Sequence, residues 1–296
     1  MAMESIGEIL NRRMDHQGNL DAIVQKTLKN SEVQAFISQN KMTREEIERS
    51  YSKFYEFVMA KEKFDLEQSH ISYEPALIMN QGYADVSYQT TQELAKQQAH
   101  LNLLKRVQIL GLPKALKKID LYNPEDVQIT NESQYQLIEA INRFIQSPKT
   151  EKGLYIYGDF GVGKSYMMAA MANELAHHEI STTVLHYPTF VSGLDFDNAK
   201  TWLNELKTAQ VVVLDDIGAE LNNSWLRDSI LQVLLQARMQ NNLPTFFTSN
   251  LTMKELEQHL AQTKKVEDIW PAKRVMERIK YLSREIHLEG VNRRHD

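Results

Sequence analysis

Residues 158–165 read Gly158-Asp159-Phe160-Gly161-Val162-Gly163-Lys164-Ser165, and this stretch decides the fold. It matches the phosphate-binding pattern G-x-x-x-x-G-K-[ST]. Upstream, residues 154–157 form a short apolar run that is typical of a buried parallel strand. Downstream, residues 166–178 are rich in Ala, Met, Leu and Glu, which favour a helix. The sequence therefore predicts a strand, a glycine loop and a helix, whose main-chain N–H groups bind phosphate.

The side chains of this loop indicate ATP and Mg²⁺ as its ligands. Lys164 is expected to contact the β- and γ-phosphates, and the Ser165 hydroxyl to bind Mg²⁺. The alternative is a glycine-rich turn that contains Lys-Ser by chance. The predicted nucleotide-binding set is Gly158, Asp159, Phe160, Gly161, Val162, Gly163, Lys164, Ser165 and Tyr166.

A second motif lies about fifty residues further on. Residues 211–216 form an apolar run that ends in two carboxylates, Asp215 and Asp216. This pattern predicts a central parallel strand that places both acids at the carboxyl edge of a sheet. Asp215 is expected to hold the hydration shell of Mg²⁺, and Asp216 to orient or deprotonate the attacking water. The alternative is an Asp-Asp turn after an ordinary strand.

A third short apolar run, residues 243–250, ends at Asn250. Asn250 is not needed as a helix cap, because Thr252 and Glu255 already form the pattern of a capping box for the next helix. Beside the first two loops, its amide is expected to position water or to sense the γ-phosphate. A simple turn asparagine is the alternative.

Arg274 and Arg278 are spaced to lie on one face of a helix, where their charges repel. They therefore require a negative partner. Glu277 or Glu285 would supply it locally, whereas an arginine finger would reach the nucleotide of a neighbouring subunit. The spacing leaves both interpretations open.

Taken in order over residues 158–278, the stretches GDFGVGKS, VVVLDDIG, FFTSN and RVMER resemble the AAA+ ATPases of bacterial replicative helicase loaders of the DnaI and DnaC type. The DnaI form is the nearest, and the IstB transposition helper is a close relative. The resemblance covers roughly residues 100–296. It implies an AAA+ domain with a parallel sheet, in which the segment from Pro113 to Leu121 lies near the adenine.

The resemblance also assigns roles to single residues. Lys164 and Ser165 correspond to the Walker A pair, Asp215 and Asp216 to the Walker B pair, Asn250 to sensor 1, and Arg278 to the trans-acting finger, with Arg274 one turn earlier. The predicted catalytic residues are thus Asp216, Asn250 and Arg278, and the predicted Mg²⁺ ligands are Ser165 and Asp215. Arg293 and Arg294 resemble the basic C-terminal end of the family, and we expect a solvated tail there.

Asp216 stands where most ATPases of the superfamily carry glutamate. An aspartate is one methylene shorter, so its carboxylate stops about 1.5 Å short of the position that a glutamate reaches. We therefore expect slow hydrolysis, stimulated by assembly or by single-stranded DNA.

Composition limits the class of protein. A chain of 296 residues predicts two domains. It contains no cysteine and no apolar stretch of eighteen or more residues, so we expect a soluble cytoplasmic protein without disulfides or membrane contact. The net charge of −5 argues against a general nucleic-acid coat protein. The last 33 residues, from Lys264, carry nine Lys and Arg against six acids, which leaves local contact with DNA phosphates open.

Residues 1–92 are expected to form a small, mainly helical α+β domain that binds the helicase. Amphipathic stripes from Ile6 to Val58 predict several helices, one of which starts at the capping box Thr43 and Glu46. Two strand-like pieces, residues 73–79 and 83–88, flank a turn at Asn80-Gln81-Gly82. In the DnaI form this region holds zinc through cysteine and histidine. Because only His70 and His100 lie near that stretch here, we predict no zinc.

Between the two parts, residues 93–132 are expected to link the domains and to begin the ATPase region. A basic helix from Glu93 to Lys118 is predicted, broken at Gly111-Leu112-Pro113. The ATPase domain then covers residues 133–296 and starts with a helix from Ser133 to Gln146.

The resemblance implies a loader that places a hexameric DnaB-type helicase on single-stranded DNA in primosome assembly and in replication initiation or restart, and that self-associates through its AAA+ domain. Three alternatives remain. A transposition helper would need a DNA-targeting N-terminal part. A small-molecule kinase would need a lid and an acceptor pocket. A nucleotide-gated adaptor would hydrolyse ATP negligibly, and the sequence does not separate it from a loader.

Overall fold

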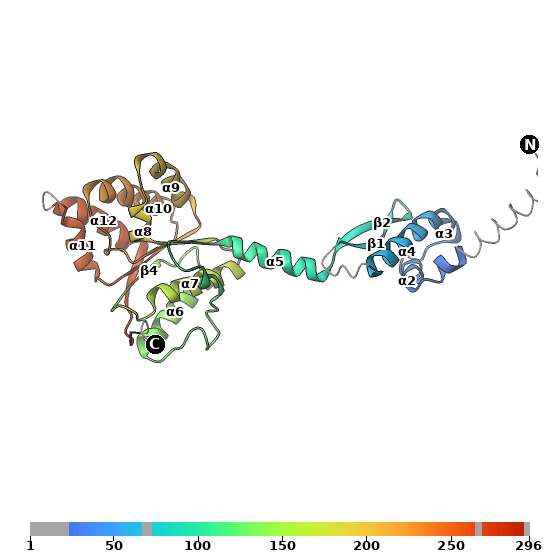
Figure 1. Ribbon diagram of the computed structural model, residues 1–296, viewed down its shortest axis with the longest axis horizontal. Helices are drawn as coiled ribbons and strands as arrows, with labels where there is room; N and C mark the ends of the chain where they lie inside the picture. Colours follow the sequence, from blue (N-terminus) through green and yellow to red (C-terminus); the bar gives the residue numbers. More distant parts are fainter. Residues whose placement is uncertain (1–23, 67–72, 264–267, 293–296) are drawn as a thin grey trace, which may run out of the picture. The chain divides into compact units, whose positions relative to one another are not determined.

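The computed structural model describes residues 24–66, 73–263 and 268–292. The predicted helix over Ile6 to Met14, His70, Arg293 and Arg294 lie outside the described residues. The chain divides into two compact units, Met1–His100 and Leu101–Asp296, which are described separately (Figure 1). Within the described ranges, no helix is long and apolar enough to cross a membrane.

The first unit is a small α+β module, as predicted. The capping box of Thr43 and Glu46 is formed at the start of its second helix. At the hairpin turn, Gln81 and Gly82 both have positive φ, which matches the twist of a two-residue hairpin loop. The hairpin packs on the helices around Phe54 and Phe57. Its elements are α2 (Ser31–Gln39), α3 (Arg44–Arg49), α4 (Tyr51–Leu66), β1 (Tyr73–Asn80), β2 (Tyr83–Thr90) and α5 (Gln92–Arg106), the last of which continues into the second unit.

The second unit is built on a six-stranded sheet in which every neighbouring pair of strands is parallel. The strand order is β3-β5-β6-β7-β4-β8. This confirms the predicted parallel α/β fold of the AAA+ class. The strands are β3 (Val107–Leu110), β4 (Gly153–Tyr157), β5 (Thr182–His186), β6 (Val211–Asp215), β7 (Thr245–Ser249) and β8 (Ser283–His287).

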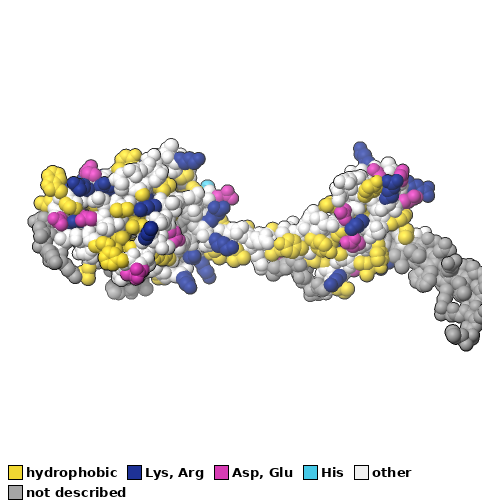
Figure 2. All heavy atoms as spheres, turned by 90° about the horizontal axis from the view of Figure 1, so that it is seen from above, with side chains coloured by type: hydrophobic (Ala, Val, Ile, Leu, Met, Phe, Trp, Pro, Cys, Tyr) yellow, Lys and Arg dark blue, Asp and Glu magenta, His cyan; other side chains and the backbone are white. Residues whose placement is uncertain are grey.

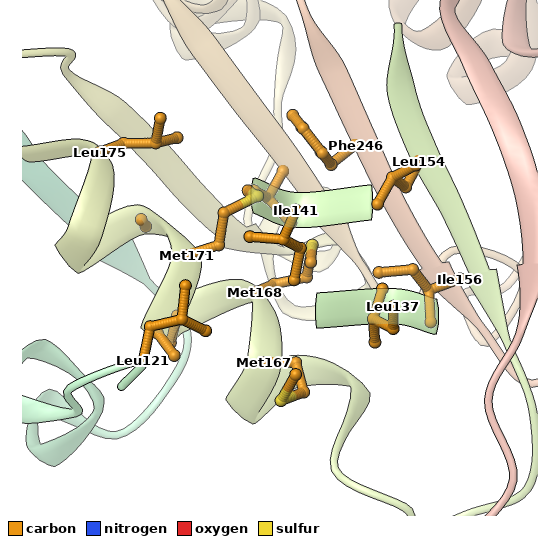
Figure 3. Close-up of a cluster of buried hydrophobic side chains, with 14 of the residues drawn as sticks. Leu121, Leu137, Ile141, Leu154, Ile156, Met167, Met168, Met171, Leu175 and Phe246 are labelled. Carbon is orange, nitrogen blue, oxygen red and sulfur yellow. The ribbon is translucent and has the colours of Figure 1, made fainter. Parts of the chain in front are cut away.

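Helices cover both faces of the sheet because the central strands are apolar on both sides. In β4, for example, Leu154 and Ile156 pack on one face and Tyr155 on the other. Figure 3 shows the first face, where side chains of α6 and α7 meet those of the strands. The helices are η1 (Lys114–Lys118), α6 (Glu132–Gln146), α7 (Lys164–His177), α8 (Tyr187–Ser192), α9 (Phe196–Thr208), the π-helical η2 (Trp225–Leu231), α10 (Gln232–Gln240), α11 (Met253–Ala261) and α12 (Ile269–Leu282).

One predicted element is wrong in part. The helix expected over residues 93–118 ends at Arg106, and residues 107–110 form the edge strand β3 beside β5. No glycine or proline separates the helix from the strand, so no local residue marks the change. The strand forms because Val107 and Ile109 pack into the core below the sheet.

A buried arginine on α10 binds the segments at the amino ends of the central strands β6 and β7, at the end of the sheet away from the phosphate loop. Arg238 is fully buried, and its guanidinium donates hydrogen bonds to the Thr245 hydroxyl and to the carbonyls of Leu206, Ala209 and Pro244. These acceptors belong to the segments that lead into β6 and β7. Arg238 thus supplies donors to the Leu206 and Ala209 carbonyls, while the Pro244 carbonyl also accepts from the Val212 N–H at 3.3 Å.

We expect Arg238→Met to lower the free energy of unfolding by about 3 kcal/mol or more, because buried carbonyls lose their donors. Urea unfolding followed by circular dichroism measures the loss. Arg143→Met is the matched control, because Arg143 lies exposed on α6 and should change stability by less than about 0.5 kcal/mol. Equal stability of the two variants would contradict the role given to Arg238.

Candidate functional site

The carboxyl ends of the central strands open into one cavity of about 530 Å³. Ligands of parallel α/β sheets bind at this edge. His186 at the end of β5, Asp215 at the end of β6 and Thr248 in β7 all line the cavity, together with residues 161–167 of the loop and helix after β4. The three motifs predicted from the sequence therefore meet in a single place.

The phosphate loop ends in a helix with uncapped donors. Helix α7 begins at Lys164, and its N-cap Gly163 has a φ of +96° and offers no side-chain hydrogen bond. The N–H groups in the first turn of a helix have no partner within the helix, so they and the helix dipole favour an anion. Gly161, Val162, Lys164, Ser165 and Tyr166 also line the cavity. This end of the loop is therefore suited to bind phosphate.

The first residues of the phosphate loop position the Lys164 side chain. Gly158 and Asp159 each accept a hydrogen bond through the main-chain carbonyl from Lys164 Nζ, both at 2.8 Å. The Phe160 side chain is 59 % exposed and does not line the cavity. Of the nine residues in the predicted nucleotide-binding set, the six from Gly161 to Tyr166 thus line the cavity, while Gly158 and Asp159 hold the lysine.

Asn250 connects a cation to an anion. Its Oδ1 accepts a hydrogen bond from Lys164 Nζ at 2.8 Å, and its Nδ2 donates to Asp216 Oδ1 at 3.0 Å. The predicted capping box of Thr252 and Glu255 is present, so Asn250 is not needed as the helix cap. One side chain therefore couples the loop after β4 to the loop after β6.

Asp215 lies between two hydroxyl groups. Its carboxylate accepts from Ser165 Oγ at 2.9 Å and from Thr248 Oγ1 at 2.6 Å, and the residue is only 1 % exposed. Carboxylate and hydroxyl oxygens are the hard ligands that Mg²⁺ prefers. The donor set of Ser165 and Asp215 fits this ion. Burial, as the main cause, raises the pKa of Asp215, while the two hydroxyl groups oppose the rise.

The raised pKa has a consequence for stability. The folded protein binds the Asp215 proton more tightly than the unfolded chain, so ionisation of this group near neutral pH opposes folding. We expect Asp215→Asn to raise the free energy of unfolding at pH 7 by about 0.5–2 kcal/mol. The gain should disappear as the pH falls below the unfolded-state pKa, where the aspartate is protonated in both states.

Thermal unfolding of the protein without nucleotide, at pH 7 and at pH 3.5, measures this difference. Asp216→Asn is the matched control, because the Asp216 side chain is more exposed. A stability gain that is the same at both pH values would contradict the electrostatic explanation.

Two site residues were not predicted from the sequence. His186 ends β5 as Asp215 ends β6, and its Nε2 lies 3.7 Å from Asp216 Oδ2. Its Nδ1 faces the main-chain N–H and hydroxyl of Thr189 at the start of α8. The second residue, Thr248, holds Asp215 and also accepts from the Asp216 N–H at 2.9 Å. A polar residue at the end of an apolar strand was the signal available for His186.

Apolar side chains from the segments before α6 also line the cavity. They are Leu112, Pro113, Leu116, Val127 and Ile129. Part of the segment from Pro113 to Leu121, which was expected near the adenine, therefore borders the same cavity as the phosphate loop. Apolar side chains together with a cluster of polar groups are typical of sites for small organic ligands.

Arg278 lies outside this cavity, on α12. Its Nε donates to Gln236 Oε1 at 2.8 Å, and a terminal nitrogen donates to the Arg274 carbonyl. Glu277 pairs with Lys280, and Glu285 accepts from the Met253 N–H, so neither acid neutralises the arginines. Burial, followed by the charge of Arg274, lowers the pKa of Arg278. Within the described residues, the two arginines thus have no carboxylate partner.

The rest of the described chain holds no group of three or more histidine, aspartate and glutamate side chains that could bind a metal ion. His100, one of the two histidines considered for zinc, lies exposed on α5.

Comparison with known proteins gives matches to both units. The family model for the N-terminus of primosomal protein DnaI matches residues 3–88, and a model described as RNA helicase matches residues 154–265. The replicative helicase loader DnaI of Bacillus subtilis (strain 168) is 35 % identical over 99 % of this chain and 100 % of its own length.

Two solved structures resemble the chain as well. A crystal structure of DnaI is 38 % identical, with a TM-score of 0.58, and covers 65 % of this chain and all of the solved chain. A putative primosome component from Streptococcus pyogenes serotype M3 is 44 % identical, with a TM-score of 0.56, and covers 67 % of this chain and all of the solved chain.

Proposed function

Because the chain belongs to the family of the replicative helicase loader DnaI, we propose that it uses ATP to load a hexameric DnaB-type helicase onto single-stranded DNA. The proposal includes a role in primosome assembly and in replication initiation or restart. ATP dependence is proposed because two sets of hydrogen bonds lie in one cavity. One set joins Lys164, Asn250 and Asp216, and the other joins Ser165 and Asp215.

In this proposal each group has a separate task. The N–H groups at the start of α7 and the Lys164 ammonium bind the phosphates. Ser165 and Asp215 would hold Mg²⁺, which would supply positive charge beside the phosphate oxygens. Asp216 orients the water, and Asn250 holds Asp216 through its amide.

The backbone conformation at Asp216 is an argument that ATP hydrolysis by this chain is slow. Asp216 adopts a left-handed conformation with a φ of +61°, which aspartate tolerates better than most residues do. Its main-chain N–H is fixed to Thr248, and the next N–H, of Ile217, donates to the Thr248 carbonyl at 2.9 Å. The loop is therefore held on both sides of Asp216 and does not shift readily to compensate for the short carboxylate.

The N-terminal unit is proposed to bind the helicase, since the family model for the DnaI N-terminus covers most of it. Contact with single-stranded DNA is assigned to the ATPase unit. On the face shown in Figure 2, Lys and Arg side chains are interspersed with Asp and Glu. Such a mixed surface argues against non-specific coating of nucleic acid.

Native mass spectrometry of this chain with a DnaB-type hexamer, with and without ATP, tests the loader function. We expect a joint complex whose stoichiometry or stability depends on ATP. A truncated chain that begins at Leu101 should retain nucleotide binding and lose the complex. Absence of any joint complex with the full chain would contradict helicase recruitment, and a complex formed equally by both chains would contradict the role of the N-terminal unit.

A further inference from the structure

The chain after β8 returns to the phosphate loop. Leu288 is fully buried, and its N–H donates to the Tyr157 carbonyl at 2.8 Å, which extends the pairing of β8 with β4 by one residue. A β-carbon added at Gly158 would lie 2.1 Å from the Leu288 carbonyl oxygen. The C-terminal segment therefore touches the first residue of the phosphate loop. We call residues 288–292 the C-terminal strap.

The middle of the strap is fixed to the start of α6. Glu289 receives a hydrogen bond at its carbonyl from Asn131 Nδ2 at 3.0 Å, and its N–H donates to Ser133 Oγ at 2.9 Å. Asn131 is also the N-cap of α6. The strap is thus attached to a rigid helix on one side before it reaches the loop on the other.

The end of the strap lies beside Gly161 and Val162 of the loop. A β-carbon at Gly161 would lie only 1.9 Å from Asn292 Oδ1, and one at Gly290 would lie 3.4 Å from Val162 Cβ. Gly161 has a φ of +78°. The positive φ favours glycine at 161, and a β-carbon there would also force the Asn292 side chain to move. Gly158 and Gly161 of the loop thus lie against the strap, and Val162 lies beside Gly290.

The strap approaches the loop from outside the cavity. Among its residues only Leu288 lines the cavity, whereas residues 289–292 do not. The strap consequently leaves the phosphate-binding side of the loop free while it limits the motion of the other side. A loop held in its bound shape loses less conformational entropy on binding, which strengthens binding.

Resting on the proposed nucleotide binding, we propose that the C-terminal strap keeps the phosphate loop in its anion-binding shape, and that Asn292 is a positioning residue that fixes Gly161. The strap then acts on affinity for phosphate and leaves the hydrolytic groups of Asp216 and Asn250 unchanged.

A double-mutant cycle tests the contact. Isothermal titration calorimetry measures the Kd of MgATP for wild type, Asn292→Gly, Gly161→Ala and the double variant. We expect Asn292→Gly to weaken binding by about fivefold, comparable to the loss of one good polar contact. Gly161→Ala should weaken it more, and the double variant less than the product of the two single effects, because the clash with Asn292 is removed.

Val291→Gly is the matched control for added backbone freedom, because the Val291 side chain is 72 % exposed. It should leave the Kd within about twofold of wild type. In steady-state ATPase assays, Asn292→Gly should raise KM and leave kcat unchanged, and its Tm should match wild type.

If the double variant weakened binding by the product of the two single effects, the contact between Asn292 and Gly161 would be contradicted. If Asn292→Gly bound MgATP more tightly than wild type, the strap would obstruct the loop instead. Either result overturns the strap proposal while wild type still binds ATP. Failure of wild type to bind MgATP would instead contradict the proposed function.

Discussion

Replacing Lys164 with alanine is expected to weaken ATP binding by at least about 100-fold, the largest effect of any single change in the site. Lys164 is 8 % exposed, and its ammonium is aimed by two loop carbonyls and by Asn250. A charge-assisted contact with phosphate is strong where water is excluded. The variant removes that charge and also the link through which Asn250 is joined to the loop.

Isothermal titration calorimetry with MgATP measures the loss, and thermal unfolding shows whether the fold is kept. Lys254→Ala, on the exposed side of α11, is the matched control and should bind as wild type does. Binding by Lys164→Ala within threefold of wild type would contradict the whole assignment of the phosphate loop.

The second large effect concerns Arg278. We expect Arg278→Ala to lower kcat by about 10³ under conditions in which the protein assembles, with little change in KM. Arg278 lies outside the cavity of its own subunit and has no carboxylate partner among the described residues, so its charge is available to a neighbour. The contact with Gln236 holds the guanidinium without neutralising it.

Mixing experiments separate this role from a structural one. Lys164→Ala and Arg278→Ala should each be inactive alone, whereas their mixture should regain activity, because an interface between the two contains one intact lysine and one intact arginine. Lys280→Ala, on the same helix, is the control and should retain activity. No recovery in the mixture, together with a lower Tm for Arg278→Ala, would contradict the finger and indicate a local role.

The main features of the fold could be predicted because local patterns and tertiary packing agree. The strand before residue 158 and the helix after it are consistent with both burial and propensity, and the structure places them within one or two residues. Strand β3 shows the limit. Its four residues follow a helix without a break, and they form a strand because they pair with β5 and pack into the core.

Some residues of the candidate site could likewise be predicted from sequence, and others could not. Polar residues at the ends of apolar strands, such as Asp215 and Asn250, could be found from sequence because strand ends meet at one edge of a parallel sheet. The contacts of His186 with Asp216 and of Asn292 with Gly161 join segments that are far apart in the chain. No spacing rule connects such segments, so these contacts required the structure.

The positive φ at Asp216 has an evolutionary consequence. A glutamate in that backbone conformation costs about 1–2 kcal/mol, so a single substitution would lengthen the acid and strain the chain at once. A faster descendant would need to remodel the turn together with the side chain. The slow hydrolysis proposed above would then depend on the main chain at this turn, which a single point mutation does not easily change.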